Sequence, residues 1–157
     1  MCAILDANVV HEVFKNGEDD AGKQFFRWIN GGLGRLVIGG RLTDELSHAS
    51  VNFRQWAKTA IKRGIIRTVR IDQIHQTEKD LIAGGNTQSN DIHIIALARV
   101  SGARLLFSND TALHKDFRNK DLIDQPRGKV FSTLKSKQFT KAHKYLLENR
   151  NLCGFKS

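Results

Sequence analysis

Two aspartates stand at the ends of apolar runs, almost the whole chain apart. Residues 2–5 run directly into Asp6, and residues 105–107 are followed by Ser-Asn-Asp, which ends at Asp110. Short apolar runs of this kind are typical of buried strands. Carboxylates placed at the exits of two core strands could bind a cation together. The pattern therefore suggests the hypothesis that the two aspartates belong to one acidic binding site.

Two further acids could join this pair. Asp91 falls in the first turn of an expected helix that opens at Ser89, and Glu45 follows an expected strand at residues 35–38. Asp44 has the same claim as Glu45 by position alone. Each of these acids also has an ordinary structural explanation, as a helix cap, a turn former or a solvated side chain.

Carboxylates do not gather without a compensating charge. Two like charges about 4 Å apart repel by roughly 4 kcal/mol at an effective dielectric constant near 20. A cluster of acids is therefore stable when it holds protons or a cation. Ligation by oxygen alone suits Mg²⁺ or Mn²⁺ better than zinc. Such an ion lowers the pKa of water and neutralises charge on a phosphate, so the cluster predicts phosphodiester hydrolysis.

Alternating strands and helices are expected to position the acids. Strands are expected at residues 2–5, 35–38, 65–71, 104–107 and 129–131, and helices at 8–14, 21–29, 43–50, 52–64, 73–85, 90–102, from 111, and at 137–148. This alternation predicts a three-layer α/β/α fold with a central, mostly parallel sheet. Ligands of such sheets lie beyond the carboxyl ends of the strands, at the switch point in strand order. Asp6 and Asp110 are therefore expected to face one crevice.

The chain is basic, and its charge is uneven. The net charge is +9, and from Lys115 to the end eleven Lys and Arg stand against four Asp and Glu, a net charge of +7. This concentration predicts a polyanionic partner, with nucleic acid as the first choice. The expected RNA contacts are Lys137, Lys141 and Lys144. Further candidates for RNA contact in this tail are Phe131, Phe139, His143 and Tyr145.

The composition bounds the class of protein. A length of 157 residues, with 40% hydrophobic and 26% charged residues, predicts one globular domain over residues 1–157, with a basic extension at about 127–157. The sequence contains no run of about 18 apolar residues, so no membrane span is expected. No signal peptide is recognised. Cys2 and Cys153 are expected to be reduced thiols, which makes a cytoplasmic location the default. The six histidines, His93 among them, are expected to be packing or surface residues.

The acids also fit a resemblance to a known family. The stretches "ILDANVV", "LTDELSHA" and "SNDIHIIALARVSGARLLFSND", followed by "TALHKDF", resemble PIN-domain nucleases and together span residues 3–117. The acidic quartet of that family falls on Asp6, Glu45, Asp91 and Asp110. The resemblance, and not the spacing, chooses Glu45 over Asp44. It also assigns supporting polar positions to Asn8, Ser108 and Asn109.

The resemblance implies a Mg²⁺- or Mn²⁺-dependent endoribonuclease, often the toxin of a toxin–antitoxin pair. Single-stranded or structured RNA, an antitoxin protein and a second copy of the chain are the partners it implies. The basic tail after about residue 126 extends beyond the short toxins. The alternative function is a non-catalytic PIN-like module that binds RNA or protein. A haloacid-dehalogenase-like phosphatase is disfavoured because Asn8 occupies the position of its second aspartate.

Overall fold

The computed structural model describes residues 2–15, 17 and 19–149. The strands are β1 (Cys2–Leu5), β2 (Arg35–Ile38), β3 (Ile66–Thr68), β4 (Leu105–Phe107) and β5 (Lys129–Phe131). The helices are α1 (Val10–Val13), α2 (Ala21–Asn30), α3 (Gly40–Ala49), α4 (Val51–Lys62), α5 (Ile71–Gly84), α6 (Ile92–Ser101), α7 (Thr111–Arg118) and α8 (Lys141–Glu148), with a short 3₁₀ helix at Ala7–Val9. All five strands pair in parallel in one sheet. The predicted α/β fold class is confirmed.

The strand order places β1 in the centre, where the direction of the chain across the sheet reverses. The order is β3-β2-β1-β4-β5, so β2 and β3 lie on one side of β1 while β4 and β5 lie on the other. Leu5 lies opposite Phe107, and the backbone N–H of Asp6 donates to the carbonyl oxygen of Phe107 at 2.9 Å. The ends of β1 and β4 therefore meet at the switch point, where ligands of open α/β sheets bind.

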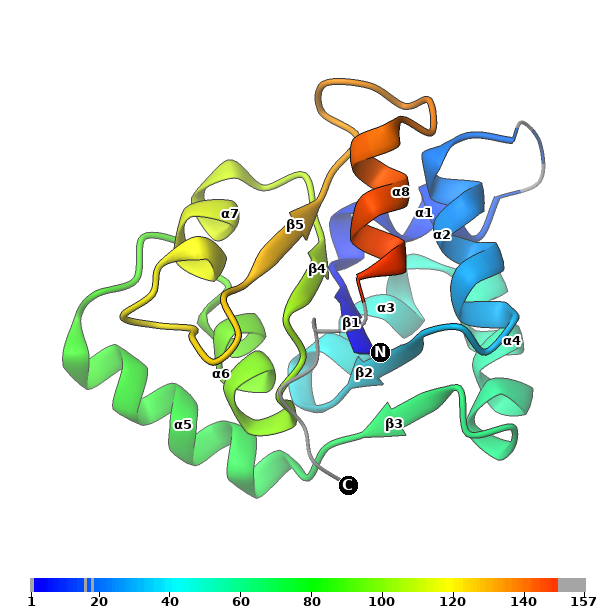
Figure 1. Cartoon of the computed structure of the whole chain (residues 1–157). Coiled ribbons are helices and arrows are strands. Elements are labelled where there is room, and N and C mark those ends of the chain that lie inside the picture. The colour runs from blue at the N-terminus through cyan, green and yellow to red at the C-terminus, as the bar shows by residue number, and fades with distance from the viewer. Residues whose placement is uncertain (1, 16, 18, 150–157) are drawn as a thin grey trace.

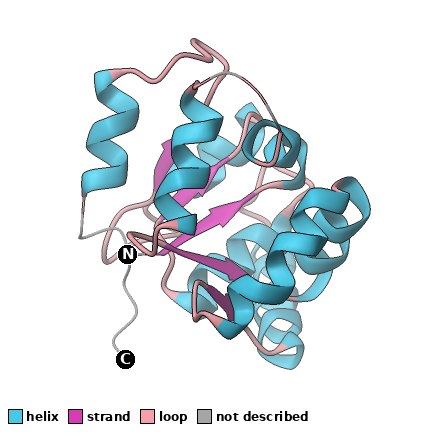
Figure 2. Cartoon of the chain, turned by 90° about the vertical axis from the view of Figure 1, so that its right-hand side faces the viewer, coloured by secondary structure: helices cyan, strands magenta, loops and turns pink. Residues whose placement is uncertain are grey.

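Helices cover both faces of this sheet (Figures 1 and 2). α2 and α8 lie on one face, and α3, α4, α5 and α6 lie on the other (Figure 2). α7 packs against the edge strand β5, and α3 contacts α6. The contact between α3 and α6 matters for function, because Glu45 lies on α3 and Asp91 stands at the start of α6.

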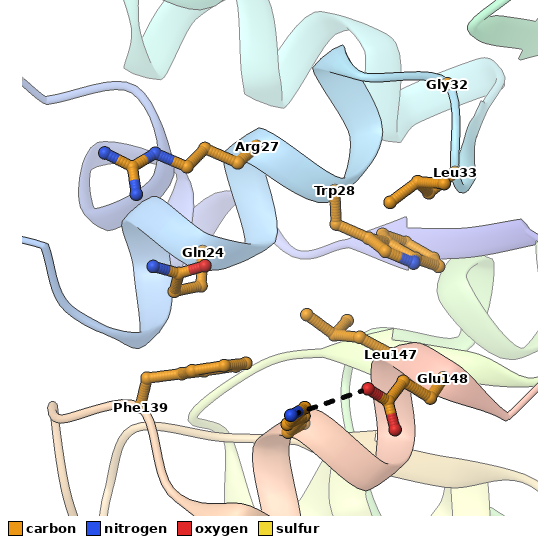
Figure 3. Close-up of a pocket in the computed structure, with 9 residues that line it drawn as sticks. Gln24, Arg27, Trp28, Gly32, Leu33, Phe139, Leu147 and Glu148 are labelled. Carbon is orange, nitrogen blue, oxygen red and sulfur yellow. Dashed lines mark ion pairs between the residues drawn. The ribbon is translucent and has the colours of Figure 1, made fainter.

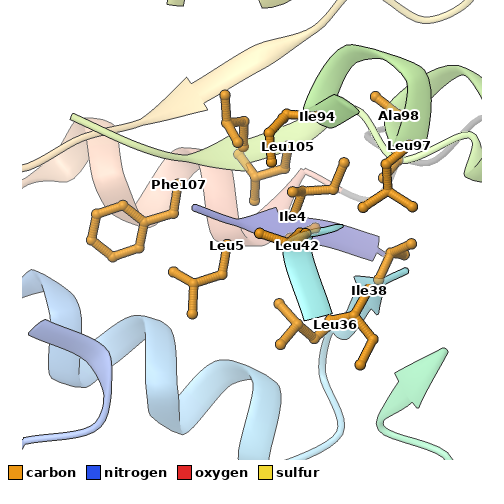
Figure 4. Close-up of a cluster of buried hydrophobic side chains, with 14 of the residues drawn as sticks. Ile4, Leu5, Leu36, Ile38, Leu42, Ile94, Leu97, Ala98, Leu105 and Phe107 are labelled. Carbon is orange, nitrogen blue, oxygen red and sulfur yellow. The ribbon is translucent and has the colours of Figure 1, made fainter. Parts of the chain in front are cut away.

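The central strands are buried on both faces. Figure 4 shows Leu5 and Phe107 on the side of α2, and Ile4 on the side of α6. The ring of Phe107 packs against the ring of Phe25 of α2, with the ring centroids 5.1 Å apart. Burial on both faces explains why these strands are continuous apolar runs without polar alternation. It also fixes where each strand ends, and therefore where Asp6 and Asp110 stand.

Several helix starts differ from the predicted ones: α3 and α5 begin earlier, at Gly40 and Ile71, whereas α6 and α8 begin later. α8 begins at Lys141, four residues after the predicted start, because Thr140 caps it: the Thr140 side chain accepts the N–H of His143, whose ring accepts the N–H of Thr140. α6 begins at Ile92 with Asp91 as its N-cap. The residues before these two starts form loops, so helical periodicity alone set both boundaries too early.

Several predictions about single residues are wrong. Phe131 and His143 are buried, so neither side chain is open to a base, whereas Tyr145 is 68% exposed. Cys2 is disulfide-bonded and not a reduced thiol. Cys153 lies outside the described residues.

Within the described part of the chain, no helix combines the length and the apolar character that crossing a membrane requires.

Candidate metal centre

Asp6 is a buried carboxylate at the exit of β1. Its side chain is 5% exposed, and the hydroxyl of Ser108 donates to its Oδ2 at 2.8 Å. Burial raises the pKa of Asp6, the Ser108 hydrogen bond lowers it, and the negative charges of Asp91 and Glu45 raise it again, with a net upward shift. The pKa of Asp6 thus responds to the charges of Asp91 and Glu45, so these two acids lie in its electrostatic neighbourhood.

Asp91 stands at the N-cap of α6, but its carboxylate does not cap the helix. No side-chain hydrogen bond is made to the first turn. The hydroxyl of Ser89 accepts the backbone N–H of Asp91 at 2.9 Å, so the predicted helix cap Ser89 fixes the Asp91 backbone instead. An N-cap aspartate normally uses its carboxylate on the N–H of the second or third helical residue. The side chain of Asp91 is therefore free for another ligand.

Glu45 faces the same place from α3. Its Oε1 lies 2.6 Å from Nε2 of His93, and ligand atoms of Glu45, Asp91 and His93 all lie within 4.8 Å of one another. Asp44, the neighbouring acid, is exposed and takes no part in this group. The structure thus brings Glu45, and not Asp44, to Asp91.

His93 is the residue of this cluster that the sequence did not reveal. It lies in the first turn of α6, two residues after Asp91, and is 3% exposed. Its neighbours along the helix are apolar, so the pattern "IHIIALA" is typical of a core helix in which a histidine packs. The available signal was its distance of two residues from an acid at a helix start.

Asp110 is placed differently from the other three acids. Its Oδ1 accepts the backbone N–H groups of Ala112 and Leu113 at 3.0 and 3.2 Å, which makes it the N-cap of α7. Its own N–H donates to Oγ of Ser108 at 3.0 Å, and that hydroxyl donates to Asp6. Asp110 is therefore joined to the crevice through Ser108. No contact among the described residues joins its carboxylate to the other three acids.

Asn109 serves as a tie between distant segments. Its Oδ1 accepts the hydroxyl of Ser132 and the N–H of Thr133, both at 2.9 Å. Thr133 in turn donates its hydroxyl to the buried carboxylate of Glu12 at 2.9 Å. Asn8 is exposed and accepts the Asn109 N–H through a long contact of 3.4 Å. Asn109 thus fastens the segment after β5 to the end of β4.

Asp116 anchors the loop that carries Asp91. Its side chain, on α7, is 1% exposed. One carboxylate oxygen accepts the N–H of Gln88 at 2.9 Å, and the other accepts the N–H of Ser89 at 2.8 Å. The loop before α6 is therefore held by a side chain 27 residues away in sequence, a long-range contact with no local sequence signal.

The acids in the crevice lack a positive partner. Among the described residues, no Lys or Arg forms an ion pair with Asp6, Asp91 or Asp110, and the one basic group beside Glu45 is His93. Oε1 of Glu45 and both ring nitrogens of His93 are buried without hydrogen-bond partners. Unpaired carboxylates in a buried site are costly. A divalent cation fits this donor set, because it would satisfy the orphaned atoms and offset the repulsion.

A large hollow of the described surface lies elsewhere. It is a groove of about 700 Å³ between α2 and α8, with Trp28, Leu33, Phe139 and Leu147 among its lining residues (Figure 3). Lys144 and Glu148 form an ion pair of 3.9 Å along its edge (Figure 3). None of the predicted acids lines this groove, so its size does not identify the site of chemistry.

Comparison with known proteins shows which protein family the sequence matches. The sequence model of one protein family, described as the PIN domain, matches residues 3–118. No curated protein matches the chain closely enough to count as a relative. The matched region contains β2 to β4, all of β1 except Cys2, and all the predicted acids.

Proposed function

Because the chain belongs to the PIN-domain family, whose members are in general metal-dependent nucleases, we propose that it hydrolyses phosphodiester bonds of RNA with Mg²⁺ or Mn²⁺. One observation carries this proposal. Ligand atoms of Glu45 and Asp91 lie within 4.8 Å of one another, the charges of both acids raise the pKa of Asp6, and none of the three has a Lys or Arg partner among the described residues. A non-catalytic binding module would have no need to maintain this repulsion.

Each residue of the crevice has a defined part in the proposal. Asp6, Glu45 and Asp91 hold the cation, which when bound neutralises charge on the phosphate and lowers the pKa of water. Ser108 orients Asp6 through its hydroxyl. Asp110 caps α7 with Oδ1, which leaves its Oδ2 as a hydrogen-bond acceptor for water at the edge of the crevice.

The proposed RNA path lies on the side of α7 and α8. A groove of about 500 Å³ is lined by Thr111, the residue after Asp110, and by Arg118 and Lys135. Positive side chains in such a groove attract phosphates. Lys137, Lys141 and Lys144 are exposed on the loop before α8 and on α8 itself. We therefore propose that residues 127–157 act as the basic extension of the nuclease and hold its substrate.

The ends of the cleaved RNA test the proposed chemistry. Attack by water leaves a 5′-phosphate and a 3′-hydroxyl, whereas attack by the neighbouring 2′-hydroxyl leaves a cyclic phosphate. We expect 5′-phosphate ends from an RNA oligonucleotide, no product in EDTA, and recovery of cleavage on addition of Mn²⁺. Cyclic ends would contradict metal-assisted hydrolysis. A DNA oligonucleotide of the same sequence, run in parallel, tests the choice of RNA.

Removing the tail lysines should weaken RNA binding. The triple variant Lys137→Ala, Lys141→Ala, Lys144→Ala loses up to three phosphate contacts. The slope of log K against log salt concentration should flatten by about 0.7 for each lost contact to a single strand. Fluorescence anisotropy with a labelled oligonucleotide, in EDTA to prevent cleavage, measures the slope at several salt concentrations.

A second triple variant provides a matched control. Arg54, Lys58 and Lys62 are exposed on α4, which lies on the opposite face of the sheet from α8 (Figure 2). Their replacement by alanine removes the same charge and should leave the slope close to that of the wild type. Equal slopes for the wild type and the tail variant would show that the basic tail does not contact RNA.

A toxin role, an antitoxin partner and a homodimer remain predictions of the family resemblance. The family match ends at residue 118, so the basic tail, which the short toxins lack, lies beyond it. Cleavage of RNA by the purified chain alone does not depend on any of these partners. The proposal for the crevice can therefore be tested separately from them.

A further inference from the structure

We propose that His93 is a nitrogen ligand of the bound cation and that it makes the site prefer Mn²⁺ to Mg²⁺. This inference rests on the proposed metal centre and deepens it. The sequence assigned oxygen ligands alone, which left the two ions equivalent. The structure adds an imidazole to the group formed by Glu45 and Asp91.

The first argument is the state of the imidazole itself. His93 is 3% exposed, and both of its ring nitrogens lack hydrogen-bond partners among the described residues. Buried polar atoms without partners are rare in native proteins, and each needs an explanation. A ligand that binds one ring nitrogen supplies that explanation.

The second argument is the direction of the contact with Glu45. Nε2 of His93 and Oε1 of Glu45 are 2.6 Å apart, yet both atoms are without a hydrogen bond. If His93 only oriented Glu45, its N–H would point at the carboxylate oxygen, as in carboxylate–histidine pairs around metal ions. Because the contact is not a hydrogen bond, the nitrogen and the oxygen instead lie side by side as two ligand atoms for the same cation.

Another buried histidine makes the contrast clear. His143 is also buried, at 7% exposure, but its ring nitrogens contact the N–H of Thr140 and the carbonyl oxygen of Ser132. Its position is explained by the capping of α8. His93 has no such role in its helix.

The third argument comes from metal chemistry. Mg²⁺ is a hard cation that takes oxygen ligands and keeps several waters, whereas imidazole nitrogen suits first-row transition ions. A site that adds one imidazole to its carboxylates therefore favours Mn²⁺ over Mg²⁺. The preference belongs to this chain, because it comes from one side chain next to the acids.

The test uses the full chain, stripped of metal, with Mn²⁺ and Mg²⁺ as the probes. Pulsed electron paramagnetic resonance of the Mn²⁺-loaded protein detects a directly bound ¹⁴N nucleus. We expect a ¹⁴N coupling in the wild type and in His143→Gln, and its loss in His93→Gln. By titration calorimetry, His93→Gln should lose at least about tenfold in Mn²⁺ affinity, the smallest loss typical even of residues that only support a ligand. Its Mg²⁺ affinity should change much less.

The possible failures are distinguishable. Tight Mn²⁺ binding without any ¹⁴N coupling in the wild type would overturn the role of His93 and leave the carboxylate centre intact. Equal losses of Mn²⁺ and Mg²⁺ affinity in His93→Gln would overturn the selectivity. Absence of binding of either ion to the folded wild type would overturn the metal centre and the proposed function together. Circular dichroism of each variant confirms that folded protein is compared.

Discussion

Asp6→Asn should lower the rate of RNA cleavage by about a hundredfold or more and, at the same time, raise the melting temperature of the metal-free protein. The loss of rate follows from the loss of a charged ligand, since even residues that support a ligand are worth about 10- to 100-fold. The gain in stability follows from charge. Asparagine keeps the shape of Asp6 and can still accept the hydrogen bond from Ser108, but it removes one of three repelling carboxylates.

The pH dependence of stability provides an independent measurement of the same effect. Burial and the charges of Asp91 and Glu45 raise the pKa of Asp6 above its ordinary value of 3.8. Folding therefore favours the protonated carboxyl group. Its contribution to stability is fully present below pH 3.8 and is lost as the pH rises through the raised pKa. Thermal melts of metal-free wild type should fall across this window, and those of Asp6→Asn should fall less.

Asp44→Asn is the matched control for this prediction. It removes the same charge from an exposed acid outside the cluster, so it should change neither the rate nor the melting temperature appreciably. Mn²⁺ should raise the melting temperature of wild type more than that of Asp6→Asn, because a ligand stabilises the state that binds it more tightly. A destabilised Asp6→Asn variant, together with no Mn²⁺ shift in either protein, would refute the metal centre.

Asp110→Asn should not share the gain in stability. The Asp110 carboxylate caps α7 with two hydrogen bonds, and a negative charge at a helix N-terminus interacts favourably with the helix dipole. Replacement by asparagine keeps the cap and removes this favourable charge. The two strand-end aspartates, which look alike in the sequence, are therefore expected to differ in the sign of their effect on stability.

The second large effect is expected at Asp116, far from the proposed chemistry. Asp116→Ala leaves the backbone N–H groups of Gln88 and Ser89 without their acceptor. A buried donor left unpaired costs roughly 1–3 kcal/mol, so the free energy of unfolding should fall by about 3 kcal/mol or more. For a domain of this size that corresponds to a fall in melting temperature of roughly 6–12 °C. The Mn²⁺-induced shift should also shrink, because the loop that holds Asp91 loosens.

Two further variants serve as comparisons for Asp116→Ala. Asp116→Asn keeps one acceptor oxygen and should lose less stability than Asp116→Ala. Asp121→Ala removes an exposed carboxylate from the turn after α7. Its free energy of unfolding should lie within about 0.5 kcal/mol of that of wild type. If Asp116→Ala melts like Asp121→Ala, the carboxylate does not anchor the loop, and Asp91 is held by other contacts.

Most strand bounds could be predicted from local signals, although β3 (Ile66–Thr68) is shorter than the predicted strand at 65–71. β1, β2 and β5 have the predicted bounds, since apolar runs end where burial ends. Once the alternation of strands and helices predicts a parallel sheet, topology brings the strand ends together. The order of elements thus predicted that Asp6 and Asp110 stand at neighbouring strand ends, whereas Glu45 was chosen over Asp44 by the family resemblance alone.

The remaining features depend on side-chain directions and long-range contacts. The sequence could not show that Asp91 leaves its helix uncapped while Asp110 caps its own, because both are aspartates at helix starts. It could not show His93 as more than a core residue, because its environment is made by α3. Asp116 acts across 27 residues, beyond any periodic pattern.

The hydrogen bonds around β5 determine when the crevice can be completed during synthesis. The N–H of Ser108, the residue that orients Asp6, donates to the carbonyl oxygen of Phe131, and Asn109 is held by Ser132 and Thr133. A ribosome makes these partners after every proposed cation ligand. The nascent protein therefore lacks the last supports of its acidic crevice while it is still tethered beside its own messenger RNA.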